Sequence, residues 1–181
     1  PFWRTDIEQP EDVVEEIGRL YGFDKLPHEL PKRSMKPVAK NPVRETKQWV
    51  RNVLCKMGAN EALTYSFVHE KVLKSVGQNP EHAYRLSNAL SPDLQYYRLS
   101  IVPSLLDKIT MNYRAGYEKF ALYEIGKTHF KGEMDENEPS VPNEDTHVAC
   151  VIAYGEKQKP TGAPYYHALQ YVTPLIGNDV V

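Results

Sequence analysis

Four carboxylates near the start of the chain have the residue types and spacing to hold a hard cation. They are Asp6, Asp12, Glu15 and Glu16. Magnesium takes carboxylate oxygens and waters in an octahedron. The three later acids recur at three- and four-residue spacing, which places them on one face of a helix. If the segment that carries Asp6 runs past that face, all four carboxylates converge. The same spacing also suits a solvated helix face, on which Glu15 and Arg19 form an exposed pair.

The residues around these acids predict a short extended segment followed by a helix. Phe2, Trp3 and Thr5 favour a strand. Pro10 suits the first helical position, and Glu11 suits the first turn, where the helix dipole favours negative charge. An apolar stripe at helical spacing and a glycine that ends the helix complete the pattern. These residues are Val13, Val14, Ile17, Leu20, Tyr21 and Gly22.

A proline-punctuated basic segment follows, and we expect it to be a partly extended linker over residues 28–42. Its cations are Lys32, Arg33, Lys36 and Lys40. These cations could contact RNA phosphates, whereas the acidic stretch over residues 131–145 would repel the phosphates. Charge runs more often mark solvated connectors, so both interpretations of the basic segment stay open.

The rest of the chain alternates between helical and strand-like patterns. Helices are expected over residues 42–58, 70–76 and 102–113. Strands are expected over residues 63–68, 83–90, 120–130 and 148–154. The last two strands flank the acidic loop and should form an antiparallel pair. Helices on one side of an antiparallel sheet give an α+β fold class.

Composition narrows the class of protein. The 181 residues are 41% hydrophobic and 10% aromatic, which fits a soluble globular protein, and the net charge of −2 argues against one that coats nucleic acid as a whole. No apolar run approaches the ~20 residues that span a bilayer, so no membrane partner is expected. Cys55 and Cys150 are too few for a disulfide framework, which favours a reducing, cytoplasmic location. The chain opens in mid-pattern without a leader, so we expect a piece of something longer.

Several spaced motifs then point to a family. They are Arg4-Thr5-Asp6-Ile7 with the later acids, Arg19-Leu20-Tyr21-Gly22-Phe23-Asp24, Glu61-Ala62-Leu63-Thr64-Tyr65-Ser66-Phe67, Leu86-Ser87-Asn88-Ala89-Leu90-Ser91, the run from Tyr97 to Leu106, and Leu122-Tyr123-Glu124-Ile125-Gly126. In this order they resemble the beta subunit of bacterial-type phenylalanyl-tRNA synthetase, over roughly residues 1–155. Phe23 and Ala89 depart from the family pattern, which has tyrosine and proline there.

The resemblance implies a domain organisation. Residues 1–27 would be the C-terminal part of a B5-like domain, residues 28–42 the linker, and residues 43–181 a partial class II synthetase-like domain. The expected hairpin over residues 120–154 would be the second signature of that fold, which in catalytic domains offers an arginine to the ATP α-phosphate. Here Glu124 stands in the first strand and Lys127 is the nearest cation. The glycine-rich third signature is absent from the chain, so we expect a non-catalytic class II fold.

The resemblance also implies a function. The chain would be part of the beta subunit of phenylalanine–tRNA ligase, an α2β2 enzyme that joins phenylalanine to tRNA(Phe) with ATP in its alpha subunits. Asp6, Asp12, Glu15 and Glu16 would match a Mg2+ site shared with the alpha subunit. We expect an architectural role and no activity of this chain alone. The alternative is mainly a tRNA-binding module. A free-standing enzyme is disfavoured because no catalytic set clusters, and the six histidines lack ligand spacing.

Overall fold

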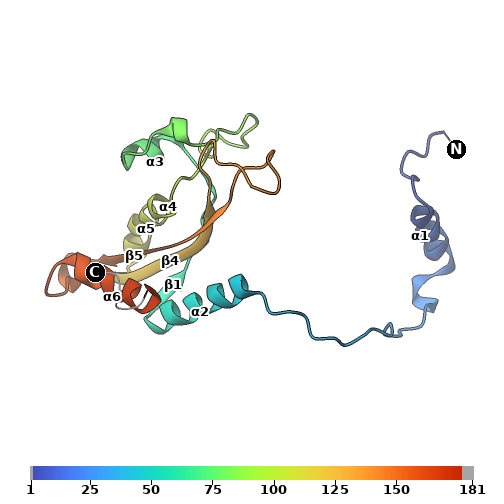
Figure 1. Ribbon diagram of the computed structural model, residues 1–181, viewed down its shortest axis with the longest axis horizontal. Helices are drawn as coiled ribbons and strands as arrows, with labels where there is room; N and C mark the ends of the chain where they lie inside the picture. The colour runs from blue at the N-terminus through green and yellow to red at the C-terminus, as the bar shows by residue number, and fades with distance from the viewer. Residues whose placement is uncertain (1, 177–181) are drawn as a thin grey trace. The chain divides into compact units, whose positions relative to one another are not determined.

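The computed structural model describes residues 2–176, and the chain divides into two compact units over residues 1–39 and 40–181. The smaller unit contains helix α1 (Pro10–Tyr21) and a 3-10 turn, η1 (Phe23–Lys25). Figure 1 draws both in blue near the N-terminus. The predicted helix is confirmed at both ends, since Pro10 occupies the first turn and Gly22 follows the last. Residues 2–9 contain no strand, although their types favour one.

The end of α1 depends on the freedom of a glycine backbone. Gly22 has φ of +100°, a conformation that side chains rarely adopt, and its N–H donates to the Gly18 carbonyl at 2.9 Å. After η1, residues 26–41 contain neither helix nor strand, and their side chains are exposed. The basic segment is therefore solvated over its whole length.

The larger unit is built on a three-stranded sheet in the order β1–β4–β5. The strands are β1 (Ala59–Glu61), β4 (Lys119–Thr128) and β5 (Asp145–Tyr154). The long pair β4 and β5 is antiparallel throughout its ten residues, as the sequence pattern predicts, and β5 forms one edge of the sheet. However, β1 pairs with β4 in parallel, so the sheet is mixed rather than purely antiparallel. The α+β class is confirmed.

Helices cover both faces of this sheet, not one face as expected (Figure 1). On one face, Leu54 of α2 (Pro42–Lys56) packs with Tyr123, and side chains of α6 (Pro164–Ile176) join them. On the other face, Leu105 of α4 (Val102–Leu106) packs with Val151. Two-sided cover explains why β4 shows no simple alternation of buried and exposed residues. The sequence patterns did not predict α6.

A second layer lies beside the main sheet. Strands β2 (Phe67–Val68) and β3 (Tyr96–Tyr97) form a two-stranded antiparallel ribbon, and α3 (Glu70–Ser75) follows β2. Leu73 of α3 and Leu99 are buried in a small core there. The remaining short elements are the 3-10 turns η2 (Pro80–His82) and η3 (Glu156–Gln158) and helix α5 (Ile109–Arg114).

In the larger unit, three predicted elements differ in the structure. The strand expected over 63–68 is reduced to Phe67–Val68, and the strand expected over 83–90 is absent apart from a single bridge between Arg85 and Tyr96. The helix expected over 102–113 is broken at Asp107 and Lys108 into α4 and α5. None of the helices within residues 2–176 combines the length and apolar character needed to cross a membrane.

Candidate functional site

The first candidate site is the acidic cluster around α1. Asp12 caps the helix: its Oδ2 accepts the backbone N–H groups of Glu8 and Gln9, each at 2.8 Å. These two donors lower the pKa of the Asp12 carboxyl. Asp12 therefore holds the start of the helix in place through its Oδ2 atom.

An arginine bridges two of the other acids. The Arg4 guanidinium binds both oxygens of Asp6, at 2.8 and 2.7 Å, and also reaches Oε1 of Glu16 at 2.7 Å. Hydrogen bonds from Arg4 lower the pKa values of both carboxyls. Arg19 binds the second oxygen of Glu16 and lies 3.7 Å from Glu15. Every predicted metal ligand thus has an arginine or backbone N–H partner.

As placed, the four acids do not form a magnesium ligand set. The structure brings Asp6 and Glu16 together, but around Arg4, while Asp12 serves the helix N-terminus and Glu15 faces Arg19. Within residues 2–176, no group of three or more His, Cys, Asp or Glu side chains is positioned to hold a metal ion. Arginine side chains contact three of the four acids, Asp6, Glu15 and Glu16.

The basic segment presents separate exposed cations. Lys40 lies 3.7 Å from Glu45 at the start of α2. The ion pairs of the described residues include none for Lys32, Arg33 or Lys36. These three side chains are free to meet an anionic partner.

In the larger unit, Glu124 belongs to a buried charge network. Arg98 and Glu124 are each 2% exposed and lie 2.8 Å apart. The Arg98 guanidinium also donates to Thr64 Oγ1 at 2.8 Å and to the Lys127 carbonyl at 3.2 Å. Thr64 donates in turn to Glu124 at 2.7 Å. A side chain at Gly126 would collide with this guanidinium, which explains the glycine.

The cations of β4 also have partners. Lys127 pairs with Glu144 at the end of the hairpin loop. Lys119 lies 5.7 Å from the centre of the Tyr154 ring, close enough for a cation–π contact. Glu124, which stands where catalytic domains of this fold would offer an arginine, is buried against Arg98. The strand therefore offers neither a free arginine nor a free lysine at its surface.

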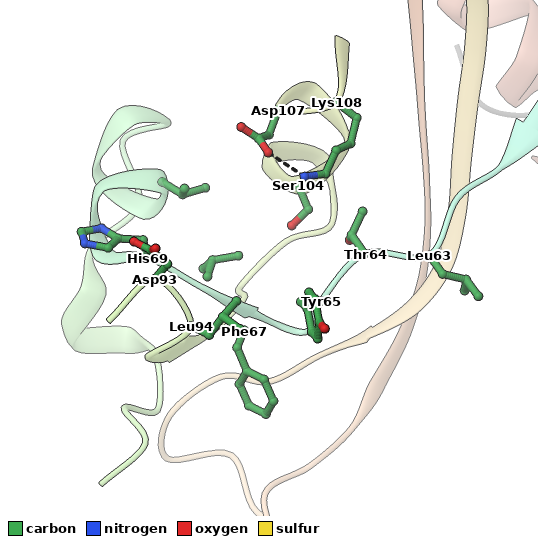
Figure 2. Close-up of a pocket in the computed structure, with 12 residues that line it drawn as sticks. Leu63, Thr64, Tyr65, Phe67, His69, Asp93, Leu94, Ser104, Asp107 and Lys108 are labelled. Atoms are coloured by element: carbon green, nitrogen blue, oxygen red, sulfur yellow. Dashed lines mark hydrogen bonds and ion pairs between the residues drawn. The ribbon is translucent and has the colours of Figure 1, made fainter. Parts of the chain in front are cut away.

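A pocket of about 610 Å³ opens between the segment before α3, the turn at Asp93 and Leu94, and helix α4 (Figure 2). Sequence patterns gave no sign of it, because its lining comes from three segments separated by loops. Tyr65 and Phe67 contribute aromatic side chains, and Ser104 contributes a buried hydroxyl.

Comparisons with known proteins agree with the motif resemblance. The family model described as "Phenylalanyl tRNA synthetase beta chain CLM domain" matches residues 26–178, and "tRNA synthetase B5 domain" matches residues 1–23. The phenylalanine–tRNA ligase beta subunit of Bifidobacterium longum is 35% identical over 147 residues, covering 78% of this chain and 17% of the relative. That of Streptococcus pyogenes is 32% identical over 183 residues, covering 98% and 23%.

A solved structure supports the fold. PylSc of Desulfitobacterium hafniense, a pyrrolysyl tRNA synthetase, superimposes with a TM-score of 0.53 at 13% identity, over 91% of this chain and 48% of that one. The chain spans about a fifth of the length of the curated relatives it matches. Because the first family model covers most of its residues, the chain belongs to the phenylalanyl-tRNA synthetase beta chain family.

Proposed function

We propose that the chain is a non-catalytic part of the beta subunit of phenylalanine–tRNA ligase. In this proposal the larger unit is a class II synthetase-like domain that supports a catalytic alpha subunit. The observation that carries the non-catalytic assignment is the state of the charges on β4: Glu124 is paired with Arg98, and Lys127 with Glu144.

Phosphoryl chemistry needs positive charge that is preorganised at the phosphate oxygens. The cations Lys119 and Lys127 of β4 already have partners, and the Arg98 guanidinium is buried in the network with Glu124. Moving any of them to a nucleotide would break an existing contact. The hairpin therefore suits a structural role better than ATP binding.

The partners follow from the family. We propose an α2β2 assembly in the cytoplasm that uses ATP to join phenylalanine to tRNA(Phe). Magnesium belongs to the proposal only in the complex with alpha, because the four acids do not form a ligand set in this chain as placed. Binding it would require Arg4 to release Asp6 and Glu16.

Phenylalanine-dependent exchange of pyrophosphate into ATP tests the catalytic assignment directly. We expect no exchange above background with this chain alone, and full exchange when the alpha subunit is supplied with the whole beta subunit. The same chain should co-purify with the alpha subunit in the absence of RNA. Exchange by the isolated chain, or no association with alpha, would contradict the proposal.

A second candidate is a tRNA-binding module, favoured by the free cations of the basic segment. Contacts from Lys32, Arg33 and Lys36 to phosphates would make RNA affinity fall steeply with salt. Replacing Lys32 and Arg33 with alanine would then reduce the slope of log K against log salt by about 2, roughly one unit per contact. An unchanged slope would exclude this role for the segment.

A further inference from the structure

The pocket beside α4 contains an unexplained polar group. Ser104 is 7% exposed, and its Oγ atom is buried with no hydrogen-bond partner among residues 2–176. Figure 2 shows this hydroxyl pointing from the helix toward the space between His69 and Thr64. A buried hydroxyl without a partner destabilises a fold. A ligand that bonds to it would remove that penalty.

The charges around the pocket determine whether a positively or a negatively charged ligand is favoured. Two carboxylates, Asp93 and Asp107, and one ammonium, Lys108, line it. Lys108 donates to Asp107 at 2.8 Å, so these two charges largely cancel. Asp93 has no ion pair among the described residues. Its uncompensated charge attracts a cation and repels carboxylate or phosphate.

The histidine at the rim does not alter this balance. Nδ1 of His69 accepts the backbone N–H of Lys71 at 2.9 Å, where it caps α3. An accepting Nδ1 carries no proton, so in this arrangement the ring is neutral. The pocket keeps one net negative charge.

The walls are mostly apolar. Leu63, Tyr65, Phe67, Val72 and Leu94 face the space, and two of them form an exposed rim, with Leu63 at 86% and Tyr65 at 72% exposure. The volume of about 610 Å³ lies in the range of small-molecule sites. Exposed aromatic rings also favour a cationic ligand through their π faces.

We propose that this pocket binds a small molecule with an apolar body and one protonated amine. Asp93 balances the charge of the amine, and the amine donates a hydrogen bond to the Ser104 hydroxyl. The apolar body lies against Tyr65 and Phe67. The proposal is independent of the function proposed above, since it uses neither the alpha subunit nor RNA.

The test uses two probes that share a phenyl ring and a two-carbon linker but carry opposite charges. Titration calorimetry of the 181-residue chain should show saturable binding of 2-phenylethylamine. Binding of 3-phenylpropanoate should be at least about tenfold weaker, because like charges oppose it. No saturable amine binding, or equal binding of the two probes, would overturn the proposal.

Variants locate the site. Asp93→Asn should weaken amine binding about tenfold or more, because a charged hydrogen bond or ion pair is lost. Ser104→Ala should weaken it about two- to tenfold, the value of one neutral hydrogen bond, without lowering the melting temperature. Glu133→Gln, which neutralises an exposed acid in the 131–145 loop, is the matched control and should change nothing. Unchanged affinity in Asp93→Asn would place the amine elsewhere and refute the assignment.

Discussion

At the residue scale, the buried pair of Arg98 and Glu124 governs the centre of the larger unit. Both charges are nearly inaccessible, and Thr64 and the Lys127 carbonyl satisfy their remaining hydrogen-bonding groups. A buried ion pair adds little net stability compared with an apolar pair, but removal of one partner leaves an uncompensated charge. The network therefore fixes the position of residues 62–66 against β4, where the backbone N–H of Ala62 donates to the Tyr123 carbonyl at 2.7 Å.

Replacing one member of the pair should be costly. We expect Arg98→Met to lower the free energy of unfolding by about 3–5 kcal/mol, since Glu124 would be left buried without its partner. Urea denaturation followed by circular dichroism measures the change. Arg51, which meets Glu61 at 2.9 Å on the surface, is the matched control, and Arg51→Met should cost only about 0.2–1 kcal/mol. Equal losses in the two variants would contradict the importance of burial.

The two thiols should differ in reactivity. Burial raises the pKa of the Cys150 thiol to about 11 from its ordinary value of 9.0, whereas Cys55 is exposed. With a thiol reagent at pH 8, we expect one fast-reacting group from Cys55 and one slow group from Cys150. Cys55→Ser should abolish the fast phase. Two equally fast groups in the folded protein would refute this prediction.

The same pKa shift sets a pH dependence. Because the neutral thiol is favoured in the folded state, the stability that it contributes is complete below pH 9 and is lost as the pH rises toward 11. The free energy of unfolding should be measured between pH 9 and pH 11 for the wild type and for Cys150→Ala. The difference between the two proteins isolates the contribution of the thiol from that of tyrosines, whose hydroxyls titrate in the same pH range.

The motif resemblance placed Arg98 and Glu124 in the family pattern but did not predict their contact. The sequence placed Glu124 in the first strand of the expected hairpin, without indicating which residue it contacts. Helices on both sides of the sheet bury residues on both faces of β4. A one-dimensional pattern cannot show that such a strand has no solvent side.

At the element scale, α1 depends on its N-terminal cap more than on burial. No residue of α1 is buried within the described structure, so its side chains contribute little core. The Asp12 carboxylate accepts the backbone N–H groups of Glu8 and Gln9, which precede the first helical residue, and so fixes the entry of the chain into the helix. Its hydrogen bonds are thus a large part of what holds the first turn.

Removing that carboxylate should loosen the helix start. We expect Asp12→Ala to reduce the helical Cα chemical shifts of residues 10–13 in NMR spectra of the full chain. Glu11→Ala, in the same turn, is the control and should have a smaller effect, because no side-chain cap depends on it. Since the pKa of Asp12 is lowered, wild-type helicity should persist above its ordinary value of 3.8 and decline as the pH falls below it. Equal effects of the two substitutions would contradict the cap.

Long elements with clear signals were predictable, and short irregular ones were not. Prolines, caps and glycines placed α1 and α2, and two apolar runs around a polar loop placed β4 and β5. The run over 83–90 resembles a strand but lacks a continuous partner, so only the bridge between Arg85 and Tyr96 forms. The spacing of the acids in the candidate metal site could be read from the sequence. The sequence did not show that Arg4 contacts them.

At the scale of the whole molecule, the two compact units are joined by a segment without regular structure. Residues 26–41 expose their side chains and form no helix or strand. Proteases cleave such a segment readily because its backbone is extended and accessible, unlike the backbone of folded elements. The basic residues within it that are not followed by proline are sites for trypsin.

Limited trypsin digestion should cut the chain first at Lys32, Arg33 or Lys40, whereas the bond after Lys36 should resist because Pro37 follows it. We expect a resistant product that retains α2 through α6, because Leu54 and Tyr123 lie in a packed core. Mass spectrometry of early time points identifies the cuts. Arg85 and Lys131, in loops of the larger unit, provide the internal comparison, and earlier cleavage there would contradict the prediction.

The edge position of β5 carries a consequence for self-association. Within residues 2–176 no strand pairs with its outer side, so a ten-residue row presents backbone N–H and C=O groups outward at alternate positions. Another extended polypeptide would lengthen the platform there through main-chain bonds alone, without regard to its side chains. To remain free of aggregates at high concentration, the protein must therefore keep this open edge from pairing with extended segments of other molecules.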